Sequence, residues 1–195
     1  MKLLREYIRE TLLTESVHPK IMEMIDALER AKGYVEILPD RVILYQPTEN
    51  NPRRWVAMVA FETPRGIRAG PCAGADAVVQ SSTAKTGMGP LAYDVAIELT
   101  GGLGLMPDRS SVSKAALAVW GKYYNDRPDV ETVQTDNHRN FLTPNDGDNC
   151  DQDSSRVDAG GQSTPVSFEK SVLSKVYKKS GTPVMDELRK RGMLK

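Results

Sequence analysis

The central third of the chain alternates short apolar runs with glycine turns and helical patterns. An apolar run at residues 75–81 is followed by the glycines of residues 87–89 and by a helical pattern over residues 91–100. A second run at residues 103–106 precedes a second helical pattern at residues 114–124. Because strands that alternate with helices pair in one sheet with the helices packed against it, this stretch predicts the core of a mixed sheet.

Three more strand patterns lie upstream of this core. The runs at residues 34–38 and 41–45 flank Pro39–Asp40, a dipeptide suited to a hairpin turn. Residues 54–61 are mostly apolar and predict a third, mostly buried strand. The three runs predict a meander, and the expected fold class is α/β of the α+β kind, a central mixed sheet flanked by helices.

The composition of the chain changes after the last of these patterns. Residues 16–136 carry the strand and helix patterns, ending with a strand pattern at residues 129–134, and predict one folded domain. Residues 137–164 are rich in Asn, Asp, Gly and Ser and predict a long loop. We therefore expect residues 137–195 to form an irregular C-terminal extension with a terminal helix that starts at Thr182–Pro183.

The first 15 residues form a separate amphipathic pattern. Leu4, Ile8 and Leu12 recur at helical spacing with charged residues opposite them. Ser16–Pro19 then separates this segment from a second helical pattern over about residues 19–32. One interpretation is an extra N-terminal helix packed on the domain, and the other is a detachable targeting segment.

Composition and charge exclude several function classes. The 26 Lys and Arg residues balance the 26 Asp and Glu residues, so no electrostatic preference for nucleic acid or an anionic membrane follows. No apolar run approaches the roughly 20 residues of a membrane-spanning helix. Two cysteines outside any CxxC pair and two histidines argue against a zinc site. We expect a soluble protein with no metal, no nucleic-acid partner and no membrane partner.

The glycine turn at residues 87–89 suits phosphate binding. Gly87 and Gly89 let backbone N–H groups approach an anion, and the start of the next helix adds a partial positive charge. The same turn also serves a plain strand-to-helix reversal. It lacks the third glycine of a dinucleotide fingerprint and the Gly-Lys-Ser/Thr of a P-loop, which disfavours nicotinamide cofactors and nucleoside triphosphates.

This order of elements resembles the GNAT family of N-acetyltransferases. Ala84–Gly89 aligns with the pyrophosphate loop of that family, Gln/Arg-x-x-Gly-x-Gly/Ala. Ser113–Trp120 aligns with its helix pattern Asn-x-x-Ala-x-x-x-Tyr. The resemblance covers about residues 33–134 and implies a GNAT-like sheet, an acyl-CoA-dependent N-acyltransferase activity, acetyl-CoA as cofactor and an unidentified amine as acceptor.

The resemblance also implies which residues bind the cofactor. Val79 and Ser81 would lie on the strand that pairs with the pantetheine arm. Five loop residues would hold the pyrophosphate: Lys85, Thr86, Gly87, Met88 and Gly89. Lys85 would partly replace the Gln or Arg of the family, because Ala84 stands at that position.

The reaction would need an acid for the leaving thiolate and a base for the amine. Trp120 stands where the family has its tyrosine, and Tyr123 and Tyr124, one turn further, are the candidate acids. Three carboxylates are candidate bases: Glu62, Asp76 and Asp108. Each carboxylate also suits an ordinary solvated or capping role, and Asp108 also suits a turn after Pro107.

The N-terminal segment resembles the capsid-targeting peptides of internal head proteins in tailed bacteriophages. A prohead protease removes such peptides after a Leu/Ile-x-Glu triplet, which Leu13–Glu15 fits, as do Ile8–Glu10 and Ile21–Glu23. This implies a phage protein in the host cytoplasm or the virion head, with capsid proteins as partners. Because Ala84 and Trp120 depart from the GNAT pattern, the alternative to an enzyme is a non-catalytic GNAT-fold protein packaged in or built into the virion.

Overall fold

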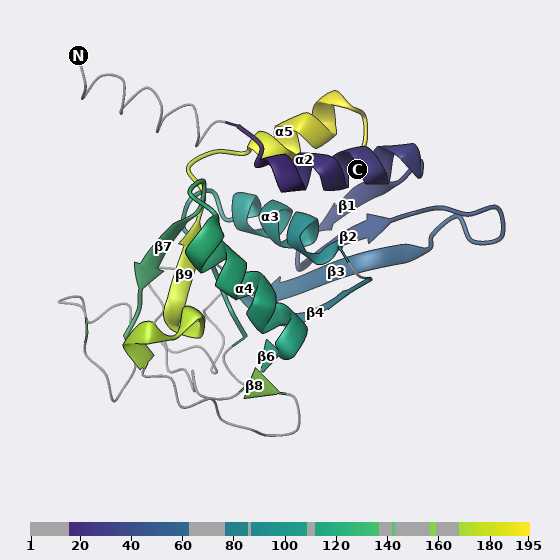
Figure 1. The fold of residues 1–195 in the computed structure, drawn as a ribbon. Coiled ribbons are helices and arrows are strands. Elements are labelled where there is room, and N and C mark those ends of the chain that lie inside the picture. Colours follow the sequence, from purple (N-terminus) through teal and green to yellow (C-terminus); the bar gives the residue numbers. More distant parts are fainter. Residues whose placement is uncertain are drawn as a thin grey trace, which may run out of the picture.

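A mixed seven-stranded sheet organises the computed structural model of this 195-residue chain (Figure 1). The structure describes residues 16–62, 77–85, 87–108, 112–136, 142, 157–158 and 168–195. In spatial order the strands are β1 (Tyr34–Leu38), β2 (Arg41–Tyr45), β3 (Trp55–Glu62), β4 (Ala77–Ala84), β5 (Leu105–Met106), β9 (Lys175–Lys178) and β7 (Glu131–Gln134). The described α-helices are α2 (Pro19–Arg30), α3 (Gly89–Leu99), α4 (Lys114–Asp126) and α5 (Pro183–Lys190).

One of the six neighbouring strand pairs described in this sheet is parallel, and the other five are antiparallel. β1 to β4 form an antiparallel meander, β4 and β5 run parallel, and β9 pairs antiparallel with both β5 and β7. A short parallel pair, β6 (Val112–Ser113) with β8 (Val157–Asp158), lies outside this sheet. The expected α+β class is confirmed, as are the meander over β1 to β3 and the order of strands and helices that follows it.

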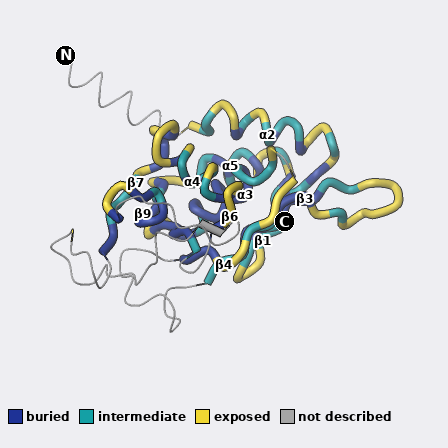
Figure 2. Tube along the Cα trace, turned by 60° about the horizontal axis from the view of Figure 1, so that its bottom comes forward, coloured by how far each residue is buried: buried dark blue, intermediate teal, exposed yellow. Residues whose placement is uncertain are grey.

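Helix α3 lies at the centre of the fold. It packs on β2, β3 and β4, and the other side of the helix contacts α2 and α5, which lie side by side in Figure 1. All residues from Leu91 to Glu98 are buried, which includes two carboxylates. Figure 2 shows the same layering, with buried residues gathered between the sheet and the helices and an exposed turn between β2 and β3.

The C-terminal part of the chain contributes to the same sheet. β9 is inserted between β5 and β7, so the sheet extends beyond residue 136, where the domain was expected to end. Gly104, just before β5, permits the close approach of β9: its φ is +112°, and a Cβ atom there would lie 2.2 Å from Cγ1 of Val176. Most of the expected loop at residues 137–164 lies outside the described residues.

The last residues of the chain run along the free side of β1. The N–H of Val35 donates to the carbonyl of Met193 at 2.8 Å, and the N–H of Lys195 donates to the carbonyl of Val35 at 2.9 Å. The N–H of Ile37 donates to the carbonyl of Lys195 at 3.1 Å. Leu194 therefore pairs with Val35 as a parallel bridge at this edge of the sheet.

Candidate functional site

The parallel strands β4 and β5, at the middle of the sheet, pair over only two residues each before they separate. β4 and β5 pair only through Ala77 with Leu105 and Val78 with Met106. On its other side β4 has one extra residue, Gln80, between its pairs with Phe61 and Ala60 of β3. Such a bulge bends the strand that carries it. Among the described strands, none pairs with β4 beyond Val78 on the β5 side, so its backbone edge there faces a gap.

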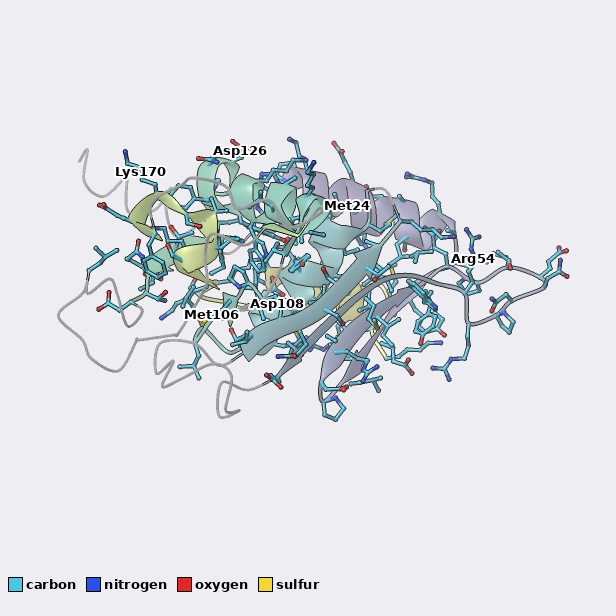
Figure 3. All side chains as sticks on the ribbon, turned by 90° about the horizontal axis from the view of Figure 1, so that it is seen from below. Met24, Arg54, Met106, Asp108, Asp126 and Lys170 are labelled. Atoms are coloured by element: carbon cyan, nitrogen blue, oxygen red, sulfur yellow. The ribbon has the colours of Figure 1, made fainter. Side chains whose placement is uncertain are left out.

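A cavity of about 220 Å³ occupies this gap. Its walls come from β4, α3, the chain after β5 and the start of α4, and its lining residues are Val79, Gln80, Ser81, Ser82, Tyr93, Asp108, Val112, Ser113, Ala116 and Trp120. Figure 3 labels Met106 at the end of β5 and Asp108 just after it. The cavity thus lies where the two parallel strands part, beyond the paired residues of β4 and the carboxyl end of β5, and such a position commonly binds ligands in α/β proteins.

A phenol and a carboxylate are among the polar side chains that line this cavity. The Tyr93 hydroxyl donates a hydrogen bond to Oγ of Ser82 at 2.8 Å. Burial raises the pKa of Tyr93, so its hydroxyl stays protonated at neutral pH and is a hydrogen-bond donor. The Trp120 indole packs edge-on against the Tyr93 ring, with centroids 4.9 Å apart. Asp108 adds a carboxylate, so the cavity combines a phenol with an acidic group.

The segment between β4 and α3 forms a tight turn beside the gap. The N–H of Lys85 donates to the carbonyl of Val56 at 2.8 Å, and the N–H of Met88 donates to the carbonyl of Lys85 at 3.1 Å. Gly87 has a φ of +90°, and a Cβ atom there would meet nothing within 4 Å. The side chain of Met88, the N-cap of α3, makes no capping hydrogen bond, so the helix begins at Gly89 without a side-chain cap.

The structure places the expected acids away from the cavity. Tyr123 is 2% exposed, and its hydroxyl lies 2.7 Å from Oδ2 of Asp94, to which it donates, and 2.9 Å from the carbonyl oxygen of Pro90. Burial, followed by the charge of Asp94, raises the pKa of Tyr123 well above its ordinary value. Tyr124 is 43% exposed, with Nζ of Lys175 5.5 Å from its ring centroid. Neither side chain lines the cavity between β4 and β5.

Tyr123 belongs instead to a buried ionic cluster. The cluster joins three carboxylates, on Asp94, Glu98 and Asp129, to the cations Arg127 and Lys179. Arg127 donates to both oxygens of Asp94 at 2.9 and 2.7 Å and also binds Asp129. Nζ of Lys179 lies 3.0 Å from Asp94 and 2.6 Å from Glu98. The cluster therefore ties α3 to the segments that follow α4 and β9.

The charges of this cluster shift the pKa values of its members. Burial alone would raise the pKa of Asp94, but Lys179 and Arg127 outweigh it and hold the pKa below its ordinary value. Burial raises the pKa of Glu98 in spite of Lys179. Glu98 also accepts the N–H groups of Val184 and Met185 at 3.0 and 2.8 Å, so it caps the start of α5.

The structure thus brings together part of the expected site. Val79, Ser81 and Asp108 line one cavity, and the expected phosphate loop, of which Lys85, Gly87, Met88 and Gly89 are described, follows the same strand β4. Thr86 and Asp76 lie outside the described residues, and Glu62 ends β3. Sequence analysis missed Tyr93. A signal was present in the largely apolar composition of residues 89–99, because a mostly apolar helix is buried together with its polar residues.

Comparison with known proteins identifies no relative of this chain. No family model, curated protein or solved structure matches the chain. The described residues contain no group of three or more His, Cys, Asp or Glu side chains that could hold a metal ion. Within the same residues, no helix has the length and apolar character needed to cross a bilayer. The site is therefore interpreted from its own residues.

Proposed function

We propose that this chain is an acyl-CoA-dependent N-acyltransferase of the GNAT type, encoded by a tailed bacteriophage. The observation that carries the proposal is the cavity between the parallel strands β4 and β5, next to a glycine turn that opens α3. The GNAT resemblance implies the same association of a parted strand pair with a phosphate loop. The meander of β1 to β3 upstream and the helix α4 downstream support it further.

The open edge of β4 suits the pantetheine arm of acetyl-CoA. The N–H and C=O groups of an extended strand without a neighbour can pair with the amides of an extended ligand. Val79 and Ser81 lie on the stretch of β4 that lines the cavity. The pyrophosphate would then lie against the turn from Lys85 to Gly89, where the uncapped start of α3 attracts negative charge.

The cavity also offers the two proton-transfer groups that the reaction needs. Asp108 would accept a proton from the ammonium group of the acceptor, whose nitrogen then attacks the thioester carbonyl carbon. A carbon–nitrogen bond forms and the carbon–sulfur bond breaks. The leaving thiolate takes a proton from a nearby phenol, and the second proton lost by the attacking nitrogen restores that phenol. Tyr93 is the phenol that lines the cavity, so it is a nearer proton donor than Tyr123 or Tyr124.

Calorimetric titration of the full chain with acetyl-CoA tests this proposal. We expect saturable binding, and we expect Gly87→Ala to weaken it at least about tenfold, because a methyl group at a φ of +90° distorts the turn that holds the phosphates. Gly192→Ala is the matched control: Gly192 also has positive φ and open space around it, but it follows α5. Absence of saturable heat with the unaltered chain would overturn the proposal.

A second candidate is a non-catalytic GNAT-fold protein of the virion. One observation favours it: Trp120 replaces the tyrosine of the GNAT pattern and packs against Tyr93, Tyr123 and Tyr177, while the Tyr123 hydroxyl is bound to Asp94. Mass spectrometry of purified virions separates the candidates. A peptide that begins at Ser16 would establish packaging and cleavage, whereas a protein missing from the particles would exclude this role.

A further inference from the structure

A histidine side chain caps the start of α2. His18 is the N-cap residue of this helix, and its Nδ1 accepts the N–H of Lys20 at 3.3 Å. Its carbonyl oxygen accepts the N–H groups of Ile21 and Met22 at 2.8 and 3.0 Å. Pro19, the first residue of the helix, has no N–H to satisfy. Among residues 19–22, the imidazole therefore holds the one N–H group that the His18 carbonyl does not bind.

A histidine can act as this acceptor only while its ring is neutral. Nδ1 has a free lone pair when the ring proton is on Nε2, and protonation turns Nδ1 into a second donor. Two N–H donors would then face each other at a helix N-terminus, where the helix dipole already disfavours a cation. Protonation of His18 thus breaks the cap and adds a repulsion, whereas serine, threonine and asparagine caps do not titrate.

The groups around His18 act on its ring in both directions. His18 lines a hollow of about 120 Å³ between α2, α4 and the start of α3. The other titratable or charged residues that line this hollow are Lys20, Lys122, Tyr123, Asp126 and Arg127. Burial, followed by the charge of Arg127, lowers the pKa of His18 in spite of the carboxylates of Asp129 and Asp94. Both carboxylates are paired with Arg127, which limits their attraction for a proton on the ring. The surroundings therefore favour the neutral ring that the cap requires.

We propose that His18 is a pH-sensitive cap, whose protonation at mildly acidic pH releases the first turn of α2. Because the folded protein binds this proton less tightly than the unfolded chain, the cap contributes fully to stability above about pH 6.5, and the contribution is lost as the pH falls below that value. Glu98 acts in the opposite sense, because a raised carboxyl pKa means that protonation favours the folded state. This inference goes beyond the acyltransferase proposal and does not depend on it.

Nuclear magnetic resonance of the full chain across this pH range tests the cap directly. We expect the His18 ring to titrate below its ordinary pKa. We also expect the amide resonance of Lys20 to shift with the same midpoint, because the two groups share one hydrogen bond. A His18 ring that titrates at or above its ordinary pKa would overturn the proposal, and so would a Lys20 amide that does not follow the ring.

Chemical denaturation at about pH 7.5 and about pH 5.5 measures the effect on stability. We expect His18 to lower the equilibrium constant for folding by about threefold to tenfold between the two conditions. Asparagine accepts the same N–H without titrating, so His18→Asn should remove this fall. His138→Asn is the matched control, because it removes the other histidine of the sequence, and it should leave the fall unchanged.

A second variant separates the cap from the other effects of the histidine. His18→Ala removes the cap at every pH, so its folding constant at about pH 7.5 should already be lower by about threefold to tenfold. Unchanged stability of His18→Ala at that pH would contradict the capping role. A fall of the same size in His18→Asn and in the unaltered chain would also overturn the proposal, because the pH dependence would then come from other groups.

Discussion

Replacing Lys179 with methionine is expected to lower the free energy of unfolding by about 3–5 kcal/mol, because it leaves buried carboxylates without their cation. Lys179 is 3% exposed and contacts both Asp94 and Glu98. The ionic cluster already holds one more carboxylate than cations. Methionine keeps the length of the side chain but removes its charge, which leaves Glu98 without the cation that it contacts and leaves Asp94 and Asp129 to Arg127.

Chemical denaturation monitored by circular dichroism measures this effect. Lys178→Met is the matched control, since Lys178 is the neighbouring lysine at the end of β9 and is only partly buried. We expect that control to stay within about 0.5 kcal/mol of the unaltered protein. Equal losses for the two lysines would contradict the role assigned to the cluster.

A double variant separates charge from packing. Glu98→Gln removes one carboxylate charge from the cluster and keeps one oxygen acceptor, enough for the N–H group of either Val184 or Met185, which bind different oxygens of Glu98. Added to Lys179→Met, it is expected to restore part of the lost stability, with a coupling of about 0.5–3 kcal/mol. If the two losses simply add, the effect of Lys179→Met comes from packing alone.

Gly104→Ala is expected to lower the free energy of unfolding by about 2–5 kcal/mol. The φ of +112° at this residue is strained for any L side chain, which costs about 1–2 kcal/mol. The new methyl carbon would also lie 2.2 Å from Cγ1 of Val176 and 3.1 Å from the carbonyl oxygen of Tyr177. Such overpacking costs about 1–3 kcal/mol more, because β9 must move away from the residues that precede β5.

At another glycine, Gly121, the change to alanine should stabilise the protein. Gly121 lies within α4, and a Cβ atom there would meet nothing within 4 Å. Gly121→Ala is therefore expected to raise the free energy of unfolding by about 0.5–1 kcal/mol through helix propensity. Thermal unfolding of the two variants measures the contrast, and a stable Gly104→Ala protein would contradict the close approach of β9.

Local sequence patterns predicted much of this fold. The hairpin at residues 34–45 and the helices around residues 19–30 and 114–126 follow from apolar periodicity and turn residues, and the structure confirms them. Strand β9 was missed because Lys175–Lys179 carries three lysines, a composition typical of a solvated segment. Its place in the sheet depends on pairing with β5 and β7, which are distant in sequence.

The site was predictable to a similar extent. The pattern after β4 indicated where a ligand could lie, and Val79, Ser81 and Asp108 do share one cavity. The choice among tyrosines could not be made from sequence, because it depends on which side of α4 faces the gap. Trp120 faces it, and Tyr123 points to Asp94, a partner 29 residues away.

The pairing of the last residues with β1 has a consequence for the behaviour of the protein in concentrated solution. Met193 and Lys195 occupy backbone hydrogen-bonding groups of Val35 and Ile37 that would otherwise face solvent. An uncovered strand edge of this kind recruits strands from other molecules. Changes that lift these residues from β1 would therefore promote self-association and aggregation, a hazard distinct from the loss of stability they cause within one molecule.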